Sequence, residues 1–197
     1  MRQIKPLVLA SRSPRRILLL KQINLSPEVI PSEIGEEMDQ AASPADNAMR
    51  LAYAKAMDVG RKVQDAVIIG ADTVVVIDGK YLGKPSDPFD AVRMLEMLSG
   101  RTHSVVTGLA ILDRPSNRSV TDFEETKVTF RSIPRNEIEA YVASGSPMDK
   151  AGAYGIQDDY GAVFVSRIEG CYYNVVGLPL SKLHSRLQEF FIQLDQQ

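Results

Sequence analysis

Two serines and three arginines fall within six residues near the start of this chain of 197 residues, in the segment 11–16 (SRSPRR). Ser13 is a favourable N-cap and Pro14 a favourable first helical residue, so the segment predicts a turn between a strand and a helix. The free N–H groups and dipole of a helix start attract anions, and arginine adds bidentate hydrogen bonds to phosphate oxygens. A capped helix with a solvated basic first turn is the alternative. Because cations oppose the helix dipole, three of them in one turn favour phosphate binding.

A carboxylate interrupts the strongly apolar run VIIGADTVVVI at Asp72, between two predicted strands at 66–70 and 73–77. A buried carboxylate is costly unless it is hydrogen-bonded, paired or bound to a cation. Asp72 could end a strand and cap the turn. It could equally bind Mg²⁺ or Mn²⁺ together with substrate phosphates, or take a proton from water. The residues alone leave both interpretations open.

Two lysines occupy positions from which they could bind a polyphosphate. Lys55 lies four residues after Leu51 and seven after Ala48, on the helical stripe that should face the core. Extension of the side chain from there to solvent is the ordinary alternative. Lys84 follows a predicted hairpin and stands before Pro85. Lysines, arginines and an acid at strand ends and helix starts are what a triphosphate–metal site requires.

The segment 149–157 (DKAGAYGIQ) combines small residues and two glycines with Gln157. Glycine lets the backbone approach a ligand closely, and a glutamine can both donate to and accept from a base edge. Many surface loops have this composition, so the signal is weak by itself. The usual nucleotide fingerprints, GxxxxGK[ST] and GxGxxG, are absent.

Short β-type runs alternate with amphipathic segments along the chain, which predicts an α/β fold. We expect strands at 7–10, 29–30, 66–70, 73–77, 81–82, 103–112, 120–130 and 162–168. We expect helices at 14–21, from 44, from 88, after 134 and at the C-terminus, where Leu183, Leu187, Phe190 and Leu194 point inward. An acidic loop occupies 33–39. Without a repeat or clear linker, the pattern favours one compact unit or two closely joined lobes.

Composition limits the possible partners and compartment. The formal net charge of −2 provides no global attraction to nucleic acid or to an anionic membrane, so any anion site must be local. With Cys171 as the one cysteine, an internal disulfide and a zinc site of several thiolates are excluded. His103 and His184 lack metal-ligand spacing and are expected to be ordinary core or surface residues. No apolar run approaches the ~18 residues of a membrane span, and no signal segment is recognisable, so we expect a cytoplasmic protein.

Seven motifs, taken in order, resemble the Maf family of nucleoside triphosphate pyrophosphatases over residues 7–180. They are ASRSPRR, LAYAKA, GADTVV, LGKPSD, SGRTHSVVTGLAI, DKAGAYGIQ and NVVGLPL. The resemblance implies a single domain, 1–197, with a mixed central β-sheet flanked by helices and a cleft between two lobes, akin to the inosine triphosphate pyrophosphatases. It also implies a divalent metal (Mg²⁺ or Mn²⁺), a cytoplasmic location and a homodimer.

The resemblance assigns roles residue by residue. It makes Asp72 the proton acceptor, and a further acid aligns best with Glu36, although Glu33, Glu37 and Asp39 are close enough to compete. The residues assigned to the substrate phosphates are Ser11, Ser13, Arg15, Arg16, Lys55 and Lys84, with Arg12 at a variable position.

Three positions separate the subfamilies. This chain resembles the dTTP/UTP type at Arg15, Thr73 and Gln157, whereas a branch acting on 7-methyl-GTP carries tryptophan, glutamine and glutamate there. A glutamine can pair with a carbonyl and an N3–H together, while a glutamate only accepts and would repel a pyrimidine carbonyl. The expected base is therefore thymine or uracil.

The resulting hypothesis is hydrolysis of dTTP and UTP to the nucleoside monophosphate and pyrophosphate. The triphosphate lies across the helix start, a divalent metal bridges it to Asp72 and Glu36, and Asp72 or a water that it orients supplies the nucleophile at the α-phosphorus. Two alternatives are the clearance of modified pyrimidine nucleotides and a regulatory role in septum inhibition, with which the family is also associated.

Overall fold

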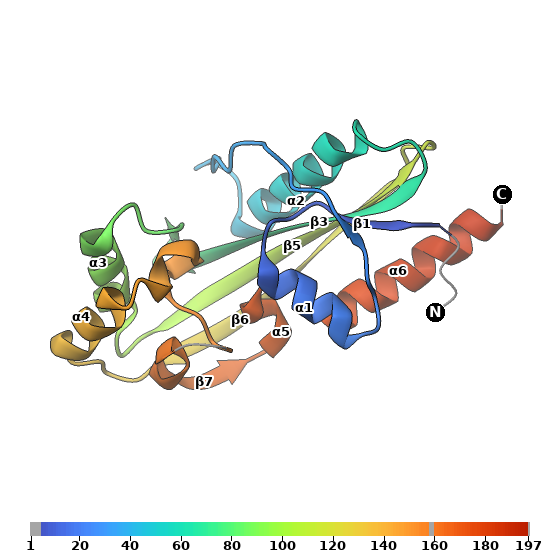
Figure 1. Cartoon of the computed structure of the whole chain (residues 1–197). Coiled ribbons are helices and arrows are strands. Elements are labelled where there is room, and N and C mark those ends of the chain that lie inside the picture. Colours follow the sequence, from blue (N-terminus) through green and yellow to red (C-terminus); the bar gives the residue numbers. More distant parts are fainter. Residues whose placement is uncertain (1–4, 158–159, 197) are drawn as a thin grey trace. The chain divides into compact units, whose positions relative to one another are not determined.

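In the computed structural model, which describes residues 5–157 and 160–196, seven strands form one mixed sheet (Figure 1). Its order is β2-β1-β3-β5-β6-β7, and β4 pairs with β3. The strands are β1 (Leu7–Leu9), β2 (Glu28–Val29), β3 (Ala66–Ile77), β4 (Lys80–Leu82), β5 (Thr102–Arg114), β6 (Ser119–Phe130) and β7 (Val165–Glu169). β1 pairs in parallel with β2 and β3, while the β3–β4 and β6–β7 pairs are antiparallel. The predicted α/β class with a mixed, helix-flanked sheet is confirmed.

The chain divides into two compact units. Unit 1 comprises Met1–Asp72, Thr107–Glu124 and Gly177–Gln197, and unit 2 comprises Thr73–Val106 and Glu125–Val176. The predicted single domain over 1–197 stays a prediction.

Unit 1 contains the helices α1 (Pro14–Gln22), α2 (Pro44–Gly60) and α6 (Leu180–Asp195). The start of α2 follows the sequence prediction, because Ser43 Oγ accepts a hydrogen bond from the Asp46 amide at 3.1 Å and Pro44 occupies the first turn. Its buried stripe includes Ala48, Leu51, Ala52 and Lys55.

Two glycines let α2 approach the sheet to backbone contact. A Cβ added to Gly70 of β3 would lie 2.1 Å from the Ala52 carbonyl oxygen. A Cβ added to Gly108 of β5 would lie 2.2 Å from the carbonyl carbon and oxygen of Ala48. Glycine within a strand often marks such a close approach. The distance between α2 and the two strands is thus fixed within unit 1 next to Asp72.

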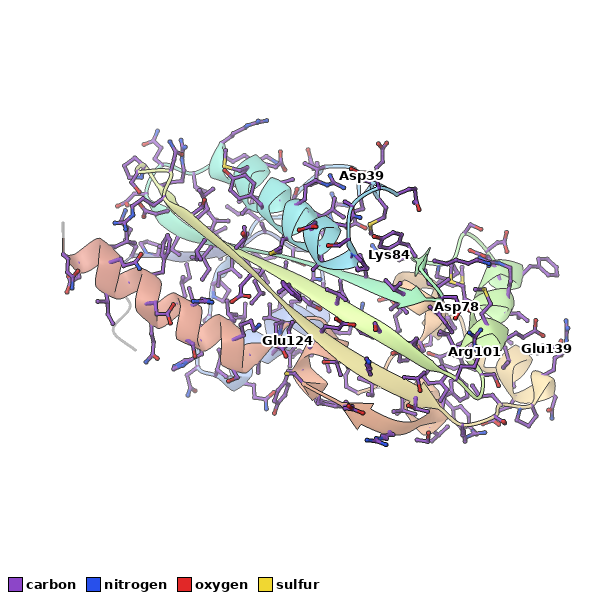
Figure 2. All side chains as sticks on the ribbon, turned by 180° about the vertical axis from the view of Figure 1, so that it is seen from behind. Asp39, Asp78, Lys84, Arg101, Glu124 and Glu139 are labelled. Atoms are coloured by element: carbon purple, nitrogen blue, oxygen red, sulfur yellow. The ribbon has the colours of Figure 1, made fainter. Side chains whose placement is uncertain are left out.

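Unit 2 contains α3 (Pro88–Leu98), α4 (Arg135–Ala143) and the short α5 (Tyr172–Val176). The side chain of Asp87 caps α3 by accepting from the Asp90 amide at 2.8 Å. The turn from β3 into β4 has positive φ at Asp78 and Gly79, as a tight hairpin requires. Figure 2 shows Asp78 and Arg101 pointing toward each other, with Arg101 Nη2 2.6 Å from Asp78 Oδ2.

The structure corrects three details of the predicted elements. The residues 66–77 form one strand rather than two, so Asp72 lies inside a strand and not in a turn between strands. The predicted strand at 162–168 begins only at Val165, because Tyr160–Phe164 forms a 3₁₀ turn. In α6, Phe191 is buried and Leu194 is only half-buried. No helix in the described ranges has both the length and the apolar character needed to cross a membrane.

Candidate active site

The centre of the candidate site is an ammonium group held between two carboxylates in unit 1. Lys55 Nζ lies 2.5 Å from Asp72 Oδ1 and 2.5 Å from Glu36 Oε1. Asp72 and Lys55 are buried, whereas the Glu36 side chain is 45% exposed. The prediction of a buried acid is therefore confirmed, and Lys55 extends to the two acids rather than to solvent. Both charges of the buried pair are satisfied by a partner, as burial requires.

The surroundings of Asp72 make it a better proton acceptor than an ordinary aspartate. Burial raises the pKa of Asp72, and the charge and hydrogen bond of Lys55, followed by the charge of Arg16, oppose this rise. Glu36 adds to the rise as a second negative charge. A carboxylate with a raised pKa has a greater affinity for a proton removed from water.

Arg16, on the first turn of α1, is a buried guanidinium in a fixed orientation. Its Nε donates to the Gly177 carbonyl at 2.8 Å, and its Nη1 donates to Ser11 Oγ at 3.1 Å. Burial lowers the pKa of Arg16, while Asp72 and Glu36 favour its charged form. A guanidinium held in this way is a preorganised group for an anion.

The hydroxyl of Ser11 organises the start of α1. It accepts from the Ser13 amide at 3.2 Å as well as from Arg16, which closes a small turn before the helix. Ser13 occupies the N-cap position as predicted, but in the described residues its side chain makes no capping bond. The amide groups of the first turn are therefore not engaged by the Ser13 hydroxyl.

The contact with Lys55 distinguishes Glu36 from the other acids of the loop 33–39. Glu33 Oε2 lies 3.9 Å from Lys62 instead, and Asp39 accepts at its side chain from the Ala41 amide. These contacts favour Glu36 over Glu33 and Asp39 as the second acid of the site. The neighbouring arginines differ in burial, Arg15 being half-buried and Arg12 exposed.

The donor set suits a hard divalent cation that is completed by substrate. Two carboxylate oxygens, from Asp72 and Glu36, converge on one positive charge, at present that of Lys55. The described ranges contain no cluster of three or more His, Cys, Asp or Glu side chains that could hold a metal alone. Mg²⁺ commonly binds one or two carboxylates together with substrate phosphates and water, so the residues fit it.

The other candidate residues belong to unit 2. Thr73 follows Asp72 directly on β3 and is half-buried, and Lys84 follows β4 and is exposed (Figure 2). Gln157 is half-buried, and its Nε2 is buried without a hydrogen-bond partner among the residues the structure describes.

A backbone link fixes the segment that carries Gln157. The Gly152 amide donates to the Gly83 carbonyl at 3.0 Å, which ties the segment 150–157 to the residue before Lys84. Gly152 has φ +70°, and an added Cβ would lie 3.1 Å from a methyl group of Val75. The positive φ favours glycine here, and an added Cβ would require the Val75 side chain to shift.

The structure thus joins part of the predicted set by direct contacts. Arg16 contacts Ser11, and Lys55 contacts Glu36 and Asp72, all in unit 1, whereas Thr73, Lys84 and Gln157 are in unit 2. The sequence reasoning missed the carbonyl of Gly177, which holds Arg16. It lies in the motif NVVGLPL, to which no role was assigned.

Comparison with known proteins identifies the family. The family described as Maf-like protein matches residues 6–190. A dTTP/UTP pyrophosphatase of Bacillus pumilus is 48% identical over 186 residues, which cover 94% of this chain and 97% of the relative. Those of Acetivibrio thermocellus and Carboxydothermus hydrogenoformans are each 49% identical, covering 95% and 92% of this chain and 96% and 97% of the relative. Because the family match and these relatives cover nearly the whole chain, the chain belongs to the Maf family.

Proposed function

We propose that this protein is a nucleoside triphosphate pyrophosphatase that hydrolyses dTTP and UTP to the nucleoside monophosphate and pyrophosphate. The observation that carries the proposal is the buried Asp72, which contacts Lys55 and interacts electrostatically with Arg16. An acid surrounded by fixed cations suits the hydrolysis of a polyphosphate. Full-length relatives that are 48–49% identical and are named dTTP/UTP pyrophosphatase support the same reaction.

In the proposed reaction, Asp72 accepts a proton from a water molecule as the water oxygen bonds to the α-phosphorus. The bond from the α-phosphorus to the oxygen that bridges it to the β-phosphorus breaks, and pyrophosphate departs. Burial raises the pKa of Asp72, which favours this proton transfer, whereas a cation held at its carboxylate would lower that pKa.

The cationic side chains hold the substrate and its developing charge. Arg16 and Lys55 neutralise phosphate oxygens near the reacting phosphorus, and Arg15 and Lys84 bind the remaining ones. Ser11 keeps Arg16 in place, and Ser13 offers a hydroxyl beside the first helical turn. Most of the rate enhancement then comes from positioning and charge stabilisation.

Asp72 and Glu36 are the residues that would hold Mg²⁺ or Mn²⁺. The cation would supply neutralisation of the phosphate charge and polarisation of the phosphoryl group. The proposal is supported by the two convergent carboxylates and by the resemblance to a metal-dependent family.

Arg15, Thr73 and Gln157 are proposed to select the base. The Nε2 of Gln157, which is buried and has no hydrogen-bond partner among the described residues, supports this assignment, because such a donor needs an acceptor and a pyrimidine carbonyl offers one. Thymine and uracil present a carbonyl next to an N3–H, which a glutamine amide pairs with completely.

A cytoplasmic location and a homodimeric state complete the proposal. The single cysteine suits a reducing compartment, and both properties are implied by the resemblance to the family.

The decisive experiment is product analysis of dTTP hydrolysis with Mg²⁺ by the wild type and Asp72→Asn. We expect pyrophosphate and dTMP from the wild type, and a loss of turnover of order 10²–10⁴-fold in the variant with an unchanged circular dichroism spectrum. Asp195→Asn, at an exposed position near the end of α6, is the matched control. Near-normal turnover by Asp72→Asn, or release of orthophosphate, would reject the proposal.

Selectivity is tested separately with kcat/KM for dTTP, UTP, CTP, GTP and base-modified pyrimidine triphosphates. A preference for dTTP and UTP is expected. A purine preference would refute the base assignment, and a large excess for a modified pyrimidine would favour the clearance of modified nucleotides.

A further inference from the structure

A buried histidine and a buried tyrosine meet inside unit 2. His103 Nε2, on β5, lies 2.8 Å from the hydroxyl of Tyr154, and the two residues are 2% and 6% exposed. Their rings and that of Phe130 pack edge to face, with centroid distances of 4.7 to 5.4 Å. The proposed reaction uses neither residue.

His103 depends on Tyr154 for its polar contacts. Its Nδ1 is buried without a hydrogen-bond partner among the described residues, so the bond from Nε2 to Tyr154 is the contact that offsets the burial of the imidazole. Burial also lowers the pKa of His103 to about 4, so the ring is neutral over the range in which most enzymes work. A ring that does not titrate there suits a fixed anchor rather than proton transfer.

Tyr154 lies three residues before Gln157 on the same short segment. The segment is already attached at Gly152, whose amide donates to the Gly83 carbonyl. The hydroxyl of Tyr154 provides a second attachment, to a central strand of the sheet. Both attachments precede Gln157 and restrict the backbone that presents its amide.

The orientation of that amide matters for the choice of base. A glutamine that turns its amide over exchanges its donor and acceptor, and the exchanged pattern matches cytosine instead of thymine or uracil. The amide can turn by rotation of the side chain alone, so which orientation is favoured depends on where the backbone places it relative to the base and its other surroundings. Discrimination between these bases therefore depends on the position in which the segment holds Gln157.

We propose that His103 and Tyr154 form a positioning pair that holds the segment 150–157 so that Gln157 selects thymine and uracil over cytosine. The inference rests on the proposed base-reading function of Gln157 and assigns a specificity role to two residues that the proposed reaction does not use. Neither is a catalytic residue.

The first test is Tyr154→Phe, which removes one oxygen and keeps the ring. We expect the ratio of kcat/KM for dTTP to kcat/KM for CTP to fall by about 10-fold. The fall should come from a change in the KM values, with kcat for dTTP nearly unchanged. Tyr141→Phe, which removes a hydroxyl from the same buried cluster, is the matched control and should keep the ratio. An unchanged ratio in Tyr154→Phe would overturn the proposal.

A double-mutant cycle with Gln157→Ala separates positioning from general damage. If Tyr154 acts through Gln157, Tyr154→Phe should cause no further loss of selectivity in the Gln157→Ala background. An equal loss in both backgrounds would contradict the proposal. If Gln157→Ala keeps the full selectivity, Gln157 does not read the base. If Gln157→Ala loses selectivity but Tyr154→Phe does not, Gln157 reads the base and only the positioning role of His103 and Tyr154 is rejected.

His103 provides an independent check that does not alter Tyr154. His103→Gln keeps a hydrogen-bonding group near the position of Nε2, whereas His103→Leu does not. We expect His103→Gln to retain more of the dTTP/CTP ratio than His103→Leu, compared at a temperature where melting curves show both variants folded. Equal ratios in the two variants would overturn the proposal.

Discussion

Lys55 combines two roles that a stability measurement can separate. Its ammonium group compensates the buried charge of Asp72 and is also the proposed ligand of a phosphate. We expect Lys55→Met to lower the free energy of unfolding by about 3–5 kcal/mol, because it leaves a buried carboxylate without its partner. Denaturant unfolding in the absence of metal measures the effect.

The double variant Lys55→Met with Asp72→Asn tests the physical reason. Removing both charges should restore much of the stability, while dTTP hydrolysis stays lost because the proton acceptor is missing. If the free energy of unfolding lost in the double variant equals the sum of the losses in the two single variants, the ion pair is not the source of the effect.

His103 predicts a specific dependence of stability on pH. Burial lowers its pKa from 6.5 to about 4 in the folded protein, so between these values the unfolded chain binds more protons than the folded one. The free energy of unfolding should therefore fall as the pH drops from 6.5 toward 4, by about 3 kcal/mol from this residue, and be unaffected by it above 6.5.

The non-titrating variant His103→Gln isolates this contribution. The difference in unfolding free energy between the wild type and the variant should shrink as the pH falls through this window. A difference that is constant with pH would show that His103 does not bind its proton as the buried geometry requires.

At the scale of elements, Gly70 sets the distance between β3 and α2. An alanine there would place its Cβ 2.1 Å from the Ala52 carbonyl oxygen, and backbone cannot yield as a side chain can. We expect Gly70→Ala to cost about 1–3 kcal/mol and to lower turnover, because Lys55 lies on the displaced helix and Asp72 on the strand. Melting curves and dTTP kinetics measure the two effects.

The matched control is Gly60→Ala at the end of the same helix. Its Cβ would lie 2.9 Å from a terminal methyl group of Leu112, and rotation of the Leu112 side chain can relieve this contact. It should leave turnover unchanged. Equal effects of the two substitutions would show that the separation of α2 and β3 is not what matters at Gly70.

Ser13 and Ser43 occupy equivalent positions before two helices but are expected to respond differently to alanine. Ser43 caps α2 through the Asp46 amide, so Ser43→Ala should cost about 1 kcal/mol without a change in the KM for dTTP. Ser13 makes no capping bond, so Ser13→Ala should leave stability nearly unchanged and raise the KM. The reverse pattern would contradict the assignment of Ser13 to the substrate.

The sequence predicted the elements with strong local signals and missed details set by tertiary contacts. The cap at Ser43 and the hairpin at Asp78–Gly79 are local features, and the structure confirms both. The interruption predicted near Gly70 was wrong, because this glycine serves a contact with Ala52 rather than a turn. Local chemistry cannot distinguish these two uses of a glycine.

The candidate site was likewise predicted only in part. Motif order singled out Asp72, Lys55 and Arg16, but no spacing rule predicts that Gly177, 161 residues later, holds Arg16. The partnership of His103 with Tyr154 likewise joins residues 51 positions apart. Such pairs are determined by the tertiary fold, which single residues do not reveal.

At the scale of the whole molecule, we propose that the chain forms one Maf-type domain, 1–197. Each of the strands β3, β5 and β6 has residues in both units, so neither unit has a complete set of strands by itself. The boundary within β3 falls between Asp72, the proposed proton acceptor, and Thr73, a proposed base-selecting residue.

The bridging position of Lys55 has a consequence for how the nucleotide arrives. The charges of Lys55 and Arg16 are balanced formally by those of Asp72 and Glu36, in a chain whose net charge is −2. These four groups therefore contribute little electric field beyond a Debye length of roughly 10 Å. Attraction of the nucleotide before contact is then left to the other proposed phosphate-binding cations, Arg15 and Lys84, and the dependence of the bimolecular rate constant on added salt should reflect those two charges.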